Sequence, residues 1–189
     1  VAFVVTTTAD TIDANPGDGI AADATGQTSL RAAIMEANAL AGRDVISVPA
    51  GTYRLTIAGA EDLAAAGDLD LTGSLMIVGA GAEATIIDGN GLERVFHIMT
   101  SATATLTDLT VRGLNANAPA FGGGLLMQGT SLQLQWTIVE NNFAGDSGGG
   151  LYVQGGEVSI EDSKFRGNQG RNGGAIRNAV GTTMTITRS

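Results

Sequence analysis

The stretch LTDLTVRG, residues 106–113, returns as LQWTIVEN at 134–141 and as IEDSKFRG at 160–167, and a fourth version begins with ITRS at 186. The versions start at Leu106, Leu134, Ile160 and Ile186, so successive starts lie 28, 26 and 26 residues apart. A second motif keeps the same step, as GGGLLMQG from Gly122, GGGLYVQG from Gly148 and NGGAIRNA from Asn172. A fixed period with two apolar stretches predicts a repeat protein in which each unit packs on the next.

The parity of the apolar positions shifts inside each repeat, and this shift locates a bend. In the first copy Leu106 has an even number and Val111 an odd one, and the other copies show the same change. Side chains of a strand alternate between two faces, so the inner face changes parity only where the chain turns a corner. The corner falls at Asp108, Trp136 and Asp162. Asp tolerates the bridge and left-handed backbone conformations that suit a corner.

One repeat therefore contains a strand, a corner, a second strand, a polar turn and a Gly-rich third strand. The polar turns carry Asn115, Asn141, Asn142 and Asn168. Such units stack about 4.8 Å apart, the strand spacing of any sheet. The sequence predicts an all-β fold, a right-handed parallel β-helix or solenoid, over residues 44–189.

Coils also precede the regular repeats, with a looser period. VISVPAGTYRLT, residues 45–56, fits a first complete coil, and short β-rich runs follow at 74–81, 84–91 and 94–100. Residues 61–73 fit no coil. We interpret them as an excursion on the rim with one helical turn.

An amphipathic helix is predicted within TSLRAAIMEANALAG, residues 28–42. Ser29 is the N-cap candidate and Gly42 the stop signal. Apolar residues follow at i, i+3, i+4 and i+7, at Leu30, Ala33, Ile34 and Ala37. The end of a solenoid exposes its apolar bore and unpaired strand edges, so we expect residues 1–43 to form an N-terminal cap. That cap would combine an edge strand, an Asx- and Gly-rich loop and the capping α-helix.

The C-terminal stretch MTITRS, residues 184–189, begins a coil without completing it. We therefore expect the β-helix to be truncated at this end, with strand edges and bore exposed. Such an end favours self-association in solution.

Composition excludes several classes of function. With 10 basic and 19 acidic residues the net charge is −9, which disfavours nucleic acid as a partner. The absence of cysteine excludes disulfides and thiolate chemistry, and a single histidine, His97, excludes sites with several histidine ligands. No apolar run approaches the ~18 residues of a membrane span, so we expect no direct membrane insertion. The chain begins at Val1 rather than Met, so we interpret it as a processed or excised form, which is consistent with a removed signal peptide.

Residues 9–56 resemble the N-terminal domain of bacterial secreted and surface β-helix proteins that carry a CSLREA motif. The segment from Ser29 to Gly51 is the most specific part of the resemblance. Thr28 and Ala21 stand where that family has a disulfide pair, and Ala32 replaces the motif's Glu. The surviving motif residues are Ser29, Leu30, Arg31, Ala33, Ile34, Glu36 and Asn38. The resemblance implies a β-helix and a secreted or cell-surface location, and it implies little about chemistry.

The aligned corners supply the candidate catalytic and glycan-binding residues. Asp108 and Asp162 lie two coils apart, about 9.6 Å at 4.8 Å per coil. This is the upper limit for two carboxylates that flank a water in an inverting glycosidase. Arg188 continues the same column, and Trp136 can stack on a sugar ring. The alternative is an acidic, solubilising wall in which Arg188 pairs with Asp162 at the surface.

Asp10, Asp13, Asn15 and Asp18 offer oxygen ligands within one loop and form a candidate calcium site, although their spacing is not that of an EF-hand. Asx residues beside Pro and Gly are also ordinary loop formers. His97 lies in a β-rich run and is interpreted as a strand residue rather than a general base.

We expect a non-catalytic structural or adhesive module of a bacterial cell surface or extracellular assembly that needs no cofactor. No convergent acid–base or metal cluster is visible in the sequence. The alternatives are a secreted carbohydrate-active enzyme, a polysaccharide lyase or glycoside hydrolase, using Asp108, Asp162 and Arg188, and a module that binds surface glycans through Trp136.

Overall fold

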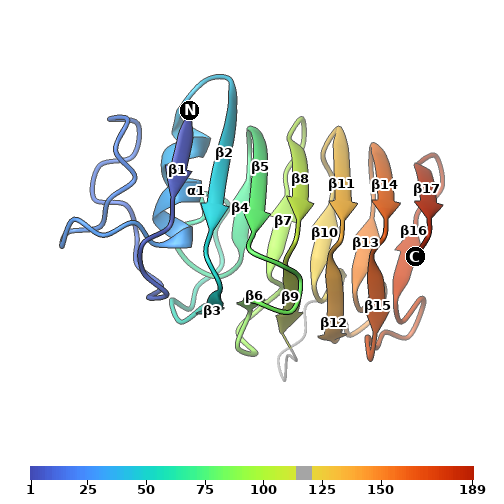
Figure 1. The fold of residues 1–189 in the computed structure, drawn as a ribbon. Helices are drawn as coiled ribbons and strands as arrows, with labels where there is room; N and C mark the ends of the chain where they lie inside the picture. Colours follow the sequence, from blue (N-terminus) through green and yellow to red (C-terminus); the bar gives the residue numbers. More distant parts are fainter. Residues whose placement is uncertain (114–120) are drawn as a thin grey trace.

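The computed structural model of the chain describes residues 1–113 and 121–189. It is a parallel β-helix in which each coil passes through three sheets, called A, B and C here (Figure 1). Sheet A contains β1 (Ala2–Val4), β2 (Arg43–Val48), β5 (Ser74–Gly79), β8 (Thr103–Thr107), β11 (Ser131–Gln135), β14 (Glu157–Glu161) and β17 (Thr183–Thr187). Sheet B contains β3 (Gly51–Arg54), β6 (Thr85–Asp88), β9 (Thr110–Gly113), β12 (Ile138–Asn142) and β15 (Lys164–Arg166). Sheet C contains β4 (Leu69–Leu71), β7 (Phe96–Ile98), β10 (Leu125–Met127), β13 (Leu151–Val153) and β16 (Ile176–Asn178).

Equivalent residues of successive coils lie beside one another on parallel strands. In sheet A the starts of the four repeats pair directly, Leu106 with Leu134, Leu134 with Ile160, and Ile160 with Ile186. The period in the sequence is therefore the length of one coil. The Gly-rich motifs lead into β10, β13 and β16, as predicted for third strands.

The corner between sheets A and B adopts the left-handed backbone conformation in each of the regular coils. The φ angles are 57° at Asp108, 44° at Trp136, 47° at Asp162 and 52° at Arg188. In sheet A the side chains at even positions, such as Leu106, point into the bore, and in sheet B those at odd positions, such as Val111, do so. Both of these residues are fully buried. The predicted change of parity is confirmed, and a left-handed corner residue produces it.

The bore is filled by aliphatic side chains and Phe96, which form one continuous core from the cap into the later coils. At the turn after sheet B, Asn142 and Asn168 form an internal ladder. The Asn142 side-chain amide donates to Val111 O at 3.2 Å and to Asn168 Oδ1 at 3.0 Å. Asn168 in turn donates to Val139 O at 2.8 Å. The predicted Asn turns are thus built into the wall; Asn115 lies outside the described residues.

The N-terminal end is covered by the helix α1 (Leu30–Ala39), as predicted. Ser29 is its N-cap and accepts a hydrogen bond from the Ala32 amide at 2.9 Å. Leu30, Ala33 and Ile34 are buried against the first coil. The strand β1 pairs in parallel with β2 and extends sheet A by one strand (Figure 1).

The excursion at residues 61–73 contains no helical turn, which corrects the prediction. It consists of bends followed by the short strand β4. Ala64 is fully buried, and so is β4, because the excursion folds back over the outer face of sheet C.

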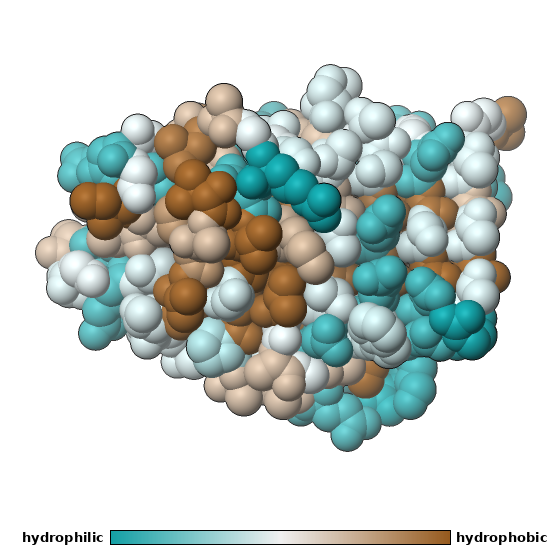
Figure 2. Space-filling model, turned by 45° about the horizontal axis from the view of Figure 1, so that its top comes forward, coloured by the Kyte–Doolittle hydropathy of each residue, from teal (hydrophilic) through white to brown (hydrophobic). Residues whose placement is uncertain are grey.

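The surface of the two ends differs in polarity. Figure 2 shows apolar side chains gathered toward the capped end and mostly polar ones over the later coils. On the face shown, the surface of the later coils is therefore mostly hydrophilic.

Candidate functional site

A cluster of ionisable side chains lies on the outer face of sheet C at the capped end. Asp70 on β4 and His97 on β7 are register partners on adjacent strands. Their strand neighbours, such as Leu69 and Phe96, point into the bore and are fully buried. Asp70 and His97 therefore point outward, yet Asp70 is 0% exposed and His97 8% exposed, because the preceding excursion covers them.

The excursion is held in place by Arg31 of α1, which is 1% exposed. Its guanidinium donates to three carbonyl groups of the excursion, Ala64 O at 2.8 Å, Gly67 O at 2.9 Å and Asp68 O at 3.4 Å. Arg31 Nε also donates to Asp10 Oδ1 at 2.6 Å. Asp10 Oδ2 accepts the amides of Thr56 and Ile57 at 2.6 and 3.0 Å. One buried ion pair thus ties the middle of the excursion to residues 56–57, just before it.

Two further residues of α1, Asn38 and Glu36, hold neighbouring segments. The Asn38 side-chain amide donates to Asp70 O at 2.7 Å and its Oδ1 accepts from the Thr72 amide at 3.0 Å. At the edge strand β4 of sheet C, the Asn38 side chain thereby makes the hydrogen bonds that a neighbouring strand would otherwise make. The buried Glu36 carboxylate accepts from the amides of Gly17 and Gly19, each at 2.5 Å. Both side chains therefore help to hold the cap together.

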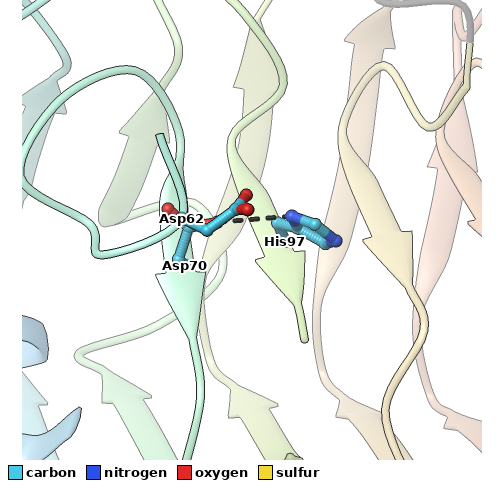
Figure 3. A group of neighbouring side chains, drawn as sticks. All are labelled: Asp62, Asp70 and His97. Atoms are coloured by element: carbon cyan, nitrogen blue, oxygen red, sulfur yellow. Dashed lines mark ion pairs between the residues drawn. The ribbon is translucent and has the colours of Figure 1, made fainter. Parts of the chain in front are cut away.

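Three side chains of the cluster converge: Asp62 from the excursion, Asp70 and His97 (Figure 3). Their ligand atoms all lie within 4.8 Å of one another. His97 Nδ1 lies 3.3 Å from Asp70 Oδ1. His97 Nε2 lies 2.8 Å from Gln128 Oε1, and the Gln128 amide donates to Gln154 Oε1 at 2.8 Å. A chain of polar side chains therefore runs along sheet C from Asp70 through His97 on β7 to Gln128 and Gln154, which directly follow β10 and β13.

Burial and neighbouring charges shift the acidity of this cluster. Burial raises the pKa of Asp68 to about 7, and the Arg94 guanidinium, 3.3 Å from Asp68 Oδ2, lowers it only in part. Burial lowers the pKa of His97, but the contacts with the Asp70 carboxylate and the Gln128 amide outweigh it, so the pKa of His97 is raised. The cluster therefore contains a carboxyl group that exchanges its proton near neutral pH.

The sequence analysis identified no convergent acid–base or metal group, whereas the fold brings Asp62, Asp70 and His97 together. His97 lies in a strand, as interpreted, but it faces two carboxylates. The alternation Asp68-Leu69-Asp70 was the available signal, because it places two acids on one face of a strand. Its pairing with His97 depends on the register between coils.

The predicted corner column is present at the surface. Arg188 binds Asp162 through two nitrogens, each at 2.8 Å, and it also contacts Glu161. The Arg188 guanidinium lowers the pKa of Asp162. Asp108 accepts a hydrogen bond from Thr107 Oγ1 at 2.7 Å. A carboxylate held in this way by Arg188 is stabilised in its ionised form, which disfavours Asp162 as a general acid.

The three carboxylates of the predicted calcium site accept hydrogen bonds from groups of the chain itself. Asp10 is bound to Arg31, as described above. Asp13 Oδ1 accepts the Asn15 amide at 3.0 Å and Asp18 Oδ1 accepts the Ile20 amide at 2.8 Å. Burial raises the pKa of Asp13, and its neighbour Glu36 adds to this shift. Calcium binding by Asp10, Asp13, Asn15 and Asp18 stays a prediction.

Comparison with protein families, with curated proteins and with solved structures finds no match. Within residues 1–113 and 121–189, no helix is long and apolar enough to cross a membrane. The resemblance to CSLREA-type proteins therefore rests on the motif residues alone.

Proposed function

We propose that the domain is a rigid, non-catalytic structural or adhesive module of a bacterial cell surface or extracellular assembly. The supporting observation is the way in which polar side chains of the wall bind one another from coil to coil. These pairs are Asp88–Arg112, Gln128–Gln154, Glu140–Arg166, Asp146–Asn172 and Asp162–Arg188. Side chains that satisfy one another along a stack stiffen the wall and leave fewer groups to act on a substrate. The surface location rests on the resemblance of the Ser29–Gly51 segment.

The enzymatic alternative is tested with pectic, alginate and uronate polymers. We expect the wild-type protein to release no unsaturated or reducing ends from them. Asp162→Ala tests the corner column, and Glu140→Ala is the matched control, since Glu140 is also an acid paired with Arg on the wall. Turnover that disappears in Asp162→Ala and persists in Glu140→Ala would establish an enzyme and refute the structural proposal.

An adhesive role is favoured by Trp136. Its side chain is 54% exposed although its backbone is left-handed, a conformation that costs about 1–3 kcal/mol for a large residue. Two of the equivalent corners have Asp, which tolerates the conformation better, and the last has Arg188. A strained backbone that presents an exposed ring supports stacking on a surface glycan.

Trp136 is the single tryptophan, so its fluorescence reports directly on binding. We expect surface polysaccharides to shift this emission, and Trp136→Asn to lose binding in a pull-down while keeping the left-handed corner. Phe165→Leu, a change at a partly buried core position, is the matched control and should bind as the wild type does. Equal binding by Trp136→Asn and wild type would exclude the ring as the contact.

Assembly through the C-terminal end is part of the same proposal. In the 189-residue chain β15, β16 and β17 are the last strands of sheets B, C and A. Ile186 on β17 pairs with Ile160 and is 52% exposed. We expect the mass in analytical ultracentrifugation to rise with concentration above 19.0 kDa, and Ile186→Lys to prevent this rise. A wild-type protein that stays monomeric at all concentrations would contradict the proposal.

A further inference from the structure

The geometry points to a binding site for a divalent transition-metal ion, Zn²⁺ in the first place, formed by Asp62, Asp70 and His97. These residues supply two carboxylates and one imidazole, a donor set that zinc accepts. The site goes beyond the proposed structural function, because it adds a ligand that ties the excursion to the wall.

The separation of the two inner ligand atoms fits a shared ion. His97 Nδ1 and Asp70 Oδ1 lie 3.3 Å apart. Two ligands at about 2.0–2.1 Å from a tetrahedral zinc ion lie about 3.3–3.4 Å from each other. The two strands therefore hold this pair at the spacing that the ion requires. The fixed strand register, which pairs Asp70 with His97, sets that spacing.

Both inner atoms carry a lone pair without a hydrogen-bond donor. Gln128 donates its amide to Gln154, so its Oε1 is turned toward His97 Nε2 and accepts the proton there. In the neutral imidazole this leaves Nδ1 as an acceptor. Asp70 Oδ2 accepts the Ala64 amide at 3.1 Å, but the buried Oδ1 has no hydrogen-bond partner. Two facing acceptors in a buried place repel each other unless a cation or a proton lies between them.

Gln128 is a positioning residue for this ligand. Metal-bound histidines usually donate their other N–H to an oxygen acceptor, which fixes the tautomer and the ring orientation. Gln128 Oε1 occupies that place at 2.8 Å, and Gln154 fixes the orientation of the Gln128 amide in turn. In this proposal the contacts among Gln154, Gln128 and His97 orient the imidazole for the ion, which packing alone would not require.

Asp62 closes the site from the solvent side. It is exposed and lies in the excursion, so its carboxylate is free to rotate by the small distance that coordination needs. The fourth position of a tetrahedral ion then falls to water on the same open side. The bound ion would join the excursion to β4 and β7, next to the segment that Arg31 holds.

The test uses the full chain after treatment with EDTA, titrated with ZnCl₂ in a calorimeter. We expect one Zn²⁺ ion per chain and a higher melting temperature in its presence, with an excess of CaCl₂ leaving the affinity for Zn²⁺ unchanged. Asp62→Asn should weaken the affinity at least 10-fold, and Gln128→Leu by about 10–100-fold. Glu157→Gln changes an exposed carboxylate on sheet A and is the matched control with unchanged affinity.

His97 is the single histidine, so ¹⁵N NMR of its ring reports the binding atom. Zn²⁺ should shift the Nδ1 resonance and leave Nε2 protonated. Because Asp62 is exposed, Asp62→Asn should remain folded, which its circular dichroism spectrum verifies. Three results would overturn the site: no binding of Zn²⁺, binding that Asp62→Asn and Glu157→Gln share equally, or an Nδ1 resonance that responds to protons only.

Discussion

The capped end and the later coils differ in how their polar groups find hydrogen-bond partners. In the later coils many polar side chains bind a residue one coil away, as when Glu140 accepts from Arg166 at the surface. At the cap the stack has no preceding coil, and side chains replace the missing neighbours. Arg31 and Asp10 there are 0% and 3% exposed in their side chains, against 59% and 26% for Arg188 and Asp162. The comparison shows that a repeat stabilises itself, whereas its end needs dedicated buried polar residues.

The largest effect is expected at Arg31. Arg31→Met leaves the Asp10 carboxylate buried without its partner and removes donors from three carbonyl groups. Breaking a buried ion pair from one side costs about 3–5 kcal/mol. Urea unfolding, followed by circular dichroism, measures this loss in the free energy of unfolding.

The double variant Arg31→Met with Asp10→Asn is the control for that experiment. It removes both charges, so we expect it to recover part of the lost stability. A loss for Arg31→Met no larger than that for Arg188→Ala would refute the distinction between the two ends.

The next effect is a pH dependence confined to the cap. Burial raises the pKa of Asp68 to about 7, whereas an unfolded Asp titrates near 3.9. Because the folded state retains the proton longer, the free energy of unfolding should fall as the pH rises from about 4 to 7, and then level off. At 1.36 kcal/mol per pKa unit the total fall approaches ~4 kcal/mol.

Asp68→Asn removes this titration while keeping the shape of the side chain. In buffers with EDTA, we expect the variant to be more stable than the wild type at pH 8 and similar to it at pH 4. Thermal denaturation across this pH range measures the difference. Parallel curves for the two proteins would mean that Asp68 does not titrate in this window.

A smaller effect is expected at Asn38, which covers the edge of sheet C. Asn38→Ala removes its bonds to Asp70 O and to the Thr72 amide, and we expect a loss of about 1–2 kcal/mol. Hydrogen exchange of the Thr72 amide should accelerate. Asn38→Asp retains the acceptor for Thr72 and should protect that amide; equal exchange in both variants would contradict the assigned contact.

The smallest effect is expected in the final coil. Arg188→Ala removes an exposed pair with Asp162, and we expect the melting temperature to change by less than about 2 °C. Salt screens exposed pairs, so 1 M NaCl should abolish even this difference. A drop of many degrees would show that the later coils also depend on single polar contacts.

The regular coils and the capping helix were predictable, because their signals are local and recur. The parity shift located the corner at Asp108, Trp136 and Asp162, and the structure has left-handed backbone at each. Ser29 and the apolar stripe that follows it defined the helix in the same way. In both cases a short window of sequence contains the cause of the local conformation.

The excursion and its cluster were not predictable by these means. The strand β4 has only three residues, and Asp68 and Asp70 beside Leu69 look like an exposed polar turn. Their burial depends on Arg31, which is far away in the sequence and clamps the excursion over them. Because the early coils have irregular lengths, the strand register that places Asp70 beside His97 could not be predicted from the repeat period either.

The sequence alone determined the β-helix, its corners and its helical cap, because strand parity and helix capping act between residues close along the chain. Only the tertiary structure decided which polar groups lose contact with water. The pKa of Asp68, the unpaired oxygen of Asp70 and the environment of His97 all follow from that loss. Desolvation depends on which distant segment covers a side chain, and no local pattern records that segment.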